Sequence, residues 1–458
     1  MFIEQIYTSC LAQASYYIES QGEAAIIDPI REPEPYLKLA TERGAKIKYV
    51  FETHFHADFV SGHIDLSKIT GAPIIFGPGA ETSYEIEVAK DEQEFPLGEL
   101  IIKVLHSPGH TLESSCYLLL DSKAKPHAIF TGDTLFVGDV GRPDLLDGVA
   151  TQEELASHLY TSLNRIIKPL SDDVLVYPAH GPGSSCGKAL GPETWSTIGE
   201  QKRSNYALQD MDEADFIQVV TDQLKPPPSY FFTDAAINKN GCEGFSEVMK
   251  RNMKALSAES FAQEFENGAV VLDTRTAEEF EKGFVKGAIN IGLNGMYAIW
   301  VATLLDHAVP CLIVAEAGKE EESISRLTRV GYEHVLGYLD GGYQTWQEKG
   351  LPSDTINSIS ATELADCENN DVILDVRREE EYGEQHLENA YNIPLASLEG
   401  QLDKVDPGQP FYIHCQTGYR SMTASSLLKR NGISNFTNVM GGMDSIQKTS
   451  MKFQQSRT

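Results

Sequence analysis

The chain has 458 residues, which at roughly 100 to 200 residues per domain predicts about three domains. Hydrophobic residues make up 41% and charged residues 23%, a balance that excludes disordered, collagen-like and disulfide-scaffold proteins. The formal net charge of -30 has the wrong sign for binding nucleic acid or an anionic membrane, so we expect neither partner.

The seven cysteines stand singly along the chain, which indicates no disulfide framework and favours a reducing cytoplasm. The N-terminal residues lack a basic leader and an apolar segment, so we expect no secretory signal. Residues 287–305 carry no charge, but two asparagines and two glycines interrupt them. This pattern favours a buried strand followed by a helix over a membrane span.

Residues 1 to about 185 alternate apolar, strand-like runs with loops that carry His and Asp. The runs lie at residues 24–29, 49–54, 73–76, 100–106, 116–121, 128–133 and 174–180. Between about 186 and 250, Pro226, Pro227 and Pro228 and several charged helical stretches predict a segment that straps domains together.

Six His and Asp residues follow the ends of four of these runs, beside small residues. Because alternate residues leaving a strand share one side, this spacing is typical of metal ligands. The candidates are His54, His56 and Asp58 after the second run, then His110, Asp133 and His180 after later runs.

The motifs THFHAD, SPGHT, GDT and YPAHG, in this order, resemble the metallo-beta-lactamase superfamily over about residues 1–185. The resemblance implies an αββα sandwich with a metal centre, which in hydrolases of the superfamily holds two ions. Phe59 stands where a ligand of the second ion is expected, and phenylalanine cannot coordinate a metal. We therefore expect one ion. His63 lies four residues further on and would replace the missing ligand only if the chain folded back.

The longer strings at 53–63 and 132–145 are similar to the persulfide dioxygenase branch of that superfamily. This similarity implies one Fe(II) per chain, held by His54, His110 and Asp133. Two imidazoles and one carboxylate leave positions open for O2 and a sulfur ligand. Groups that orient the ligands or water would then be His56, Asp58 and His180.

Two residues near this centre are candidates for substrate binding. The Arg142 guanidinium suits a carboxylate of a thiol carrier, and a salt bridge to Asp144 or Asp147 is an equal alternative. Cys186 lies in a glycine-rich turn, where it either approaches the iron or is a small buried side chain.

The C-terminal 200 residues contain an internal repeat. Residues 271–275 match 373–377 at an offset of 102, and residues 311–315 match 411–415 at an offset of 100. Each copy alternates short apolar strands, at 270–273, 311–314 and 335–339 in the first, with helical stretches. This order predicts two α/β domains with parallel sheets. We expect domains at 1–240, which includes the helical linker, at 250–355 and at 356–458.

Cys415 follows the strand-like residues 411–414 and opens a loop that ends at a helix. Such a loop turns backbone N–H groups inward and stabilises a thiolate or a bound anion. The residues around Cys415 resemble the active-site loop of rhodaneses over about 355–458, which implies that Cys415 accepts sulfur. Four residues separate Cys415 from Arg420, whereas cysteine phosphatases have five. The substrate-binding loop would be Gln416, Thr417, Gly418, Tyr419 and Arg420.

The first copy has Ala315 where the nucleophile belongs and Glu320 where the arginine belongs. Because an alanine cannot accept sulfur and acids repel an anion, we expect an inactive rhodanese-like domain.

The whole pattern resembles fusions of a persulfide dioxygenase with rhodanese domains in bacterial sulfide detoxification. It implies oxidation of a thiol persulfide by O2 to sulfite, followed by thiosulfate formation at Cys415. The carrier thiol is left open among glutathione, coenzyme A and similar thiols, and we expect a homo-oligomer. The alternatives are a mononuclear zinc thioester hydrolase of the glyoxalase II kind with appended sulfurtransferase domains, and a non-enzymatic persulfide carrier.

Overall fold

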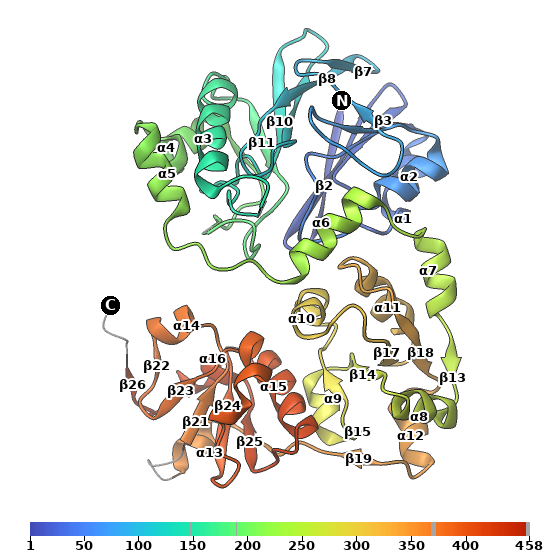
Figure 1. Ribbon diagram of the computed structural model, residues 1–458, viewed down its shortest axis with the longest axis vertical. Coiled ribbons are helices and arrows are strands. Elements are labelled where there is room, and N and C mark those ends of the chain that lie inside the picture. The colour runs from blue at the N-terminus through green and yellow to red at the C-terminus, as the bar shows by residue number, and fades with distance from the viewer. Residues whose placement is uncertain (146–147, 189, 368–371, 455–458) are drawn as a thin grey trace. The chain divides into compact units, whose positions relative to one another are not determined.

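The computed structural model describes residues 1–145, 148–188, 190–367 and 372–454 (Figure 1). It divides into two compact units, one of Met1–Val248 with Thr328–Gly331 and one of the remaining residues. Within the described parts of the chain, every helix is too short or too polar to cross a bilayer.

The first unit contains two six-stranded sheets packed face to face. One sheet has the order β1 to β6 and the other the order β12 to β7. The strands are β1 (Phe2–Thr8), β2 (Gln13–Ser20), β3 (Glu23–Ile27), β4 (Lys46–Phe51), β5 (Ile74–Phe76), β6 (Glu87–Val88), β7 (Glu94–Leu97), β8 (Leu100–His106), β9 (Ser115–Leu120), β10 (Pro126–Gly132), β11 (Leu175–Pro178) and β12 (Ser196–Thr197).

Alternation along the strands builds the layers of this unit. In β2, Tyr16 and Ile18 enter the core between the sheets, whereas Tyr17 packs under the helices on the outer face. Helices cover both outer faces, so the expected αββα sandwich is confirmed. The helices are α1 (Glu34–Arg43), α2 (His63–Thr70), α3 (Gln152–Ser162), α4 (Ile198–Ser204), α5 (Glu213–Thr221), α6 (Tyr230–Asn240) and α7 (Phe245–Asn252).

The segment expected to strap domains together packs largely within the first unit. Phe216 of α5 joins the core beneath the second sheet. In α6, the Asn238 amide donates to the backbone oxygens of His56 and Phe59 at 2.8 and 2.7 Å. The segment therefore braces the loop that carries the metal-ligand motif.

The second unit contains two five-stranded sheets, both parallel throughout, as the repeat predicts. The first has the order β13-β18-β17-β14-β16 and the second the order β20-β25-β24-β21-β23. Their strands are β13 (Ala255–Leu256), β14 (Val270–Asp273), β16 (Ile289–Asn290), β17 (Cys311–Val314), β18 (Val335–Leu339), β20 (Ser358–Ile359), β21 (Val372–Asp375), β23 (Ala390–Asn392), β24 (Phe411–His414) and β25 (Phe436–Val439).

The remaining elements of the second unit flank these sheets. Two small antiparallel pairs are β15 (Phe284–Val285) with β19 (Ser353–Asp354), and β22 (His386–Leu387) with β26 (Phe453–Gln454). The helices are α8 (Ala258–Glu266), α9 (Ala277–Lys282), α10 (Tyr297–Leu304), α11 (Glu320–Thr328), α12 (Gly342–Glu348), α13 (Ala361–Asp366), α14 (Glu379–Glu384), α15 (Tyr419–Arg430) and α16 (Gly442–Ile446).

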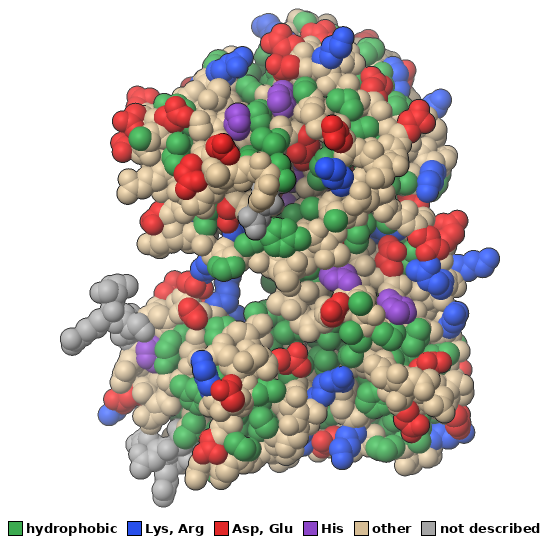
Figure 2. Space-filling model, viewed as in Figure 1, with side chains coloured by type: hydrophobic (Ala, Val, Ile, Leu, Met, Phe, Trp, Pro, Cys, Tyr) green, Lys and Arg blue, Asp and Glu red, His purple; other side chains and the backbone are tan. Residues whose placement is uncertain are grey.

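The uncharged stretch at 287–305 forms β16 and α10, which confirms the expected strand followed by a helix. Acidic and basic side chains are interspersed over the visible face of each unit in Figure 2. The strong negative charge is therefore spread over this face and is not gathered in one patch.

Candidate metal centre and cysteine loop

Four strand ends of the first unit bring the predicted ligand candidates together. His54 follows β4, His110 follows β8, Asp133 follows β10 and His180 follows β11. The turn before Asp133 requires glycine, because Gly132 has a φ of 51° and a Cβ there would lie 2.6 Å from the Thr53 side chain. All the candidates of the sequence motif are buried.

One set of donors consists of His54, His110 and Asp133, whose ligand atoms lie within 4.8 Å of one another. Oδ2 of Asp133 is 3.8 Å from Nε2 of His54 and 3.4 Å from Nε2 of His110. These three residues are the set that the resemblance implied.

Hydrogen bonds on the far side of each ring fix the orientation of the two imidazoles. Nδ1 of His110 lies 2.8 Å from the Arg142 carbonyl oxygen, to which it donates. The Thr53 hydroxyl donates to Asp28, so it accepts from Nδ1 of His54 at 2.9 Å. Both Nε2 atoms are then free of hydrogen and face Asp133, which is how metal-binding histidines are held.

The donor set fits a divalent cation. Both carboxylate oxygens of Asp133 are buried and have no hydrogen-bond partner within the described structure, and a cation satisfies such atoms. Burial holds the pKa of His54 well below its usual value, helped by His56, His110 and His180. The neutral imidazole, which is the form that binds metals, is therefore favoured.

A second set of donors lies on the other side of Asp133. Nε2 of His180 is 3.5 Å from Oδ1 of Asp133 and 3.5 Å from Oδ2 of Asp58. Cys186 approaches the same group, because its sulfur lies within 4.8 Å of donor atoms of Asp133 and His180. Burial raises the pKa of the Cys186 thiol well above its usual value. The second set therefore contains His56, Asp58 and His180, and Cys186 lies beside it.

The side chain at position 59 adds no ligand to this second set. Phe59 is buried, and its ring centroid lies 4.4 Å from that of His56. His63 does not replace it, because Nδ1 of His63 lies 3.2 Å from Glu52 and Nε2 lies 2.7 Å from the Tyr84 hydroxyl. The sequence prediction that position 59 lacks a donor therefore holds in the folded chain.

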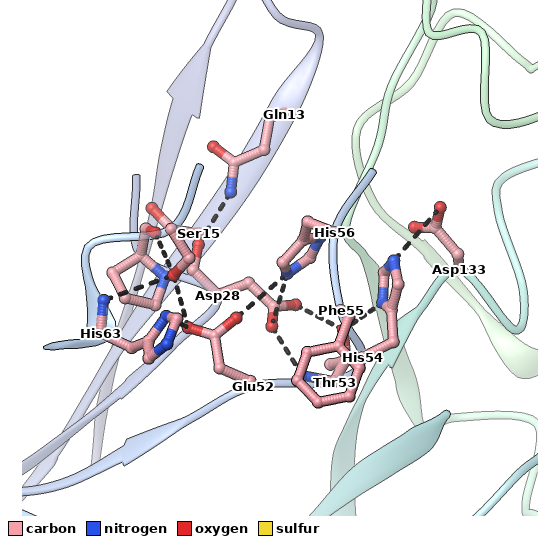
Figure 3. A network of polar contacts seen from close by, with 12 residues as sticks. Gln13, Ser15, Asp28, Glu52, Thr53, His54, Phe55, His56, His63 and Asp133 are labelled. Carbon is pink, nitrogen blue, oxygen red and sulfur yellow. Dashed lines mark hydrogen bonds and ion pairs between the residues drawn. The ribbon is translucent and has the colours of Figure 1, made fainter. Parts of the chain in front are cut away.

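His56 is held from behind by two buried acids that sequence reasoning missed (Figure 3). Its Nε2 lies 3.1 Å from Oδ1 of Asp28 and 3.3 Å from Oε2 of Glu52. Burial by itself would lower the pKa of His56, but Asp28 and Glu52 outweigh it and hold the pKa well above the usual value. Both acids directly follow strands β3 and β4, which is the signal that could have identified them.

A cavity of about 280 Å³ opens beside the first donor set. The lining is mainly apolar, and the basic side chain among the described lining residues is Lys239. His110, Ala57 and Phe231 form its buried end, whereas Phe232 is half exposed.

Arg142 does not line this cavity. Its guanidinium pairs with Asp144 at 2.7 and 2.8 Å, which is one of the two roles the sequence left open. Asp147, the other possible partner, lies outside the described residues. The carboxylate-binding role of Arg142 stays a prediction.

Cys415 directly follows strand β24, and its loop leads into helix α15. The thiol is buried and accepts a hydrogen bond from the Gly418 N–H at 3.2 Å. Gly418 has a φ of 104°, a conformation that favours glycine and turns this N–H toward the sulfur. The structure thus provides a backbone donor of the kind that the loop predicts.

The other loop residues face different neighbours. Arg420 forms a two-pronged ion pair with Glu381, at 2.6 and 2.7 Å. Gln416 donates to Asp444 at 2.6 Å, and Thr417 is exposed. Burial by itself would raise the pKa of Glu381, but its hydrogen bonds with Arg420 lower it to about 2. No spacing or motif linked Glu381 with Arg420 before the structure showed their ion pair.

The family models match both parts of the chain. The metallo-beta-lactamase superfamily model matches residues 8–181, and the rhodanese-like domain model matches residues 257–349 and 360–449. The chain belongs to the metallo-beta-lactamase superfamily, in the form that carries two rhodanese-like domains C-terminal to the metal-binding domain.

Individual proteins are similar to parts of the chain. A metallo-beta-lactamase structure from Staphylococcus aureus is 31% identical with a TM-score of 0.65, and the match covers 74% of this chain and 98% of that one. A probable hydroxyacylglutathione hydrolase, glo2, from Schizosaccharomyces pombe is 35% identical over 160 residues, which are 34% of this chain and 58% of the relative. The structure of ETHE1 from Myxococcus xanthus is 29% identical with a TM-score of 0.45, over 52% of this chain and 98% of that one. The chain thus spans somewhat more than half the length of the curated hydrolase.

Proposed function

We propose that the chain is a persulfide dioxygenase with a sulfurtransferase. The observation that carries this proposal is the buried set of His54, His110 and Asp133 beside a cavity, with Phe59 in place of a further ligand. Two imidazoles and one carboxylate are the donor set of non-haem Fe(II) oxygenases. An Fe(II) ion bound there would activate O2 and bind the terminal sulfur of the persulfide.

The proposed oxidation converts RSSH, O2 and water into RSH, sulfite and two protons. The outer sulfur is oxidised, O2 is reduced, and the S–S bond breaks so that the carrier leaves as a thiol. The protein contributes fixed imidazoles, through the hydrogen bonds of Thr53 and Arg142 behind them. The apolar cavity excludes water around the reacting sulfur and orients the carrier.

The proposed transfer takes place at Cys415. The thiolate attacks the outer sulfur of a second persulfide, the S–S bond to the carrier breaks, and RSH leaves. Sulfite then attacks the outer sulfur on Cys415, which releases thiosulfate and restores the thiolate. The Gly418 N–H, 3.2 Å from the sulfur, supports the negative charge on Cys415 in both steps.

The lining of the cavity also indicates which kind of carrier thiol would fit there. This mainly apolar lining suits a carrier with an uncharged arm, and the charged side chains of Glu81, Glu113 and Lys239 would contact polar groups beyond that arm. Glutathione, coenzyme A and similar cytoplasmic thiols are the carriers to compare.

Thioester hydrolysis with zinc is a second candidate, and specific observations favour it. The chain is 35% identical over 160 residues to a probable hydroxyacylglutathione hydrolase. In addition, Asp58 and His180 lie with Asp133 as possible ligands of a second ion. An ion bound between them and the first set would supply a metal-bound water for hydrolysis.

One experiment separates the two candidates. The chain is purified anaerobically, its iron and zinc are quantified, and it is given glutathione persulfide, coenzyme A persulfide and the matching thioesters. We expect one iron per chain and one O2 consumed per persulfide, with sulfite as the product of the oxidation. Zinc content with thioester cleavage and no O2 uptake would overturn the proposal.

A further inference from the structure

Helix α15, which begins at the Cys415 loop, packs against the edge of the first rhodanese-like domain. The backbone N–H of Asn290, in the edge strand β16, donates to the Ser426 hydroxyl at 3.0 Å. Arg430, at the end of α15, donates to the Gly287 carbonyl at 2.9 Å. The copy that lacks a nucleophile therefore contacts the helix that carries the active loop.

The same contact reaches the loop itself through Tyr419. The Tyr419 hydroxyl donates to the Gly292 carbonyl at 2.8 Å. Its ring lies against the backbone of Gly295, where a Cβ would come within 2.5 to 2.9 Å of three ring atoms. Gly295 does not have a left-handed φ, so its role is to leave space for this ring.

Hydrogen bonds within the first domain hold the turn at residues 292–295, which Tyr419 contacts. Arg326 of α11 donates to the carbonyls of Leu293 and Gly295 at 2.7 and 3.3 Å. The Leu293 N–H donates in turn to the Thr274 carbonyl at 3.1 Å. Tyr419 thus contacts a turn that is held by hydrogen bonds within the first rhodanese-like domain.

Fixing Tyr419 has a direct consequence for the thiol. Tyr419 directly follows Gly418, whose N–H points at the Cys415 sulfur, and precedes Arg420, which pairs with Glu381. A movement of the Tyr419 backbone would therefore displace the N–H donor and the guanidinium together.

We propose that the first rhodanese-like domain is a positioning element for the Cys415 loop and that Tyr419 is the positioning residue through which it acts. This inference rests on the proposed sulfur transfer at Cys415. It gives the copy with Ala315 and Glu320 a role that requires no chemistry of its own.

A double-mutant cycle in the full chain tests the contact. Gly295→Ala pushes a methyl group into the Tyr419 ring, and we expect kcat/KM for sulfur transfer from thiosulfate to cyanide to fall about tenfold. In a Tyr419→Ala background the methyl group meets no ring, so the same substitution should cost less than about twofold. Tyr419→Phe keeps the ring and loses one hydrogen bond. Its kcat/KM should therefore lie between the values of the wild-type chain and of Tyr419→Ala.

Gly400→Ala is the matched control, because a Cβ at Gly400 meets no atom within 4 Å, and it should transfer sulfur at the unchanged rate. Hydrogen exchange of the amides at 416–420 supplies a readout that needs no activity, and we expect faster exchange in Gly295→Ala and Tyr419→Ala. The inference would be overturned if amide exchange at 416–420 were the same in the variants as in the wild-type chain, and if Gly295→Ala reduced sulfur transfer equally with Tyr419 present and with Tyr419→Ala. If the wild-type chain transferred no sulfur, but Gly295→Ala still accelerated amide exchange in the loop, the proposed function would be overturned and the contact between Tyr419 and Gly295 would stand.

Discussion

Nε2 of His180 lies 3.5 Å from Oδ1 of Asp133, whereas the imidazoles of the first donor set face Oδ2 of the same carboxylate. Asp133 therefore stands between two sets of donors, and the side chain at position 59 decides how complete the second set is. We expect this arrangement to set the number of ions that the chain binds.

Restoring a donor at position 59 should change the metal content. We expect Phe59→His to raise the content from one ion per chain toward two, because an imidazole there would join Asp58 and His180. Metal analysis after reconstitution with Fe(II) or Zn(II) measures this, and Phe59→Leu, which adds no donor, is the control. A content of one ion in both variants would contradict the assignment of the second set.

Removing a ligand should separate the two activities. We expect His110→Ala to lose the ion and persulfide-dependent O2 uptake, by at least about a hundredfold, because only two donors of the first set remain. Sulfur transfer from thiosulfate at Cys415 should persist. His127→Ala, near the start of strand β10 and at the end opposite to Asp133, should keep its ion. Loss of metal from both variants would point to general unfolding.

Replacing the nucleophile should have the converse effect. In Cys415→Ser we expect O2 uptake to continue while sulfite accumulates and thiosulfate is absent, because the alcohol cannot accept sulfur. Product quantification by chromatography measures the three species. Loss of O2 uptake in this variant would favour the persulfide-carrier alternative.

Filling the cavity should weaken binding of the carrier. Ala235 lines the cavity from α6, and we expect Ala235→Trp to raise KM for the persulfide about tenfold through lost space for the carrier. Val219→Trp, at an exposed site on α5, is the control for the added indole. An unchanged KM in Ala235→Trp would place the carrier elsewhere.

The Arg420–Glu381 ion pair should give a pH-dependent contribution to stability. The pKa of Glu381 is lowered to about 2 from an ordinary value of 4.5, so the contribution is present above about pH 4.5 and is lost as the pH falls toward 2. Because the pair is partly exposed, we expect it to contribute about 1 kcal/mol or less to the free energy of unfolding at neutral pH. The difference in urea midpoint between the unchanged chain and Glu381→Gln should shrink from pH 7 to pH 3, and a difference that grows over this range would contradict the assignment.

The sequence alone determined the architecture and most of the candidate chemistry. The repeat offset predicted two parallel-sheet domains, and the strands at 270–273, 311–314 and 335–339 form at those residues. The positions of His and Asp after strand-like runs gave six candidate ligands, because these patterns are local in sequence. The resemblance to the persulfide dioxygenase branch then singled out His54, His110 and Asp133, which the structure brings within 4.8 Å of one another.

Only the tertiary structure decided how groups distant in sequence meet. The partners of Arg420, His56 and Tyr419 are Glu381, Asp28 and Gly295, and no spacing in the chain links these pairs. Such contacts depend on how sheets and helices pack, since a pair separated by tens of residues is joined by folding and not by local pattern. Packing also placed Phe59 and His63 against other neighbours, so neither adds a ligand to the second donor set, whereas His56 of the same motif belongs to it.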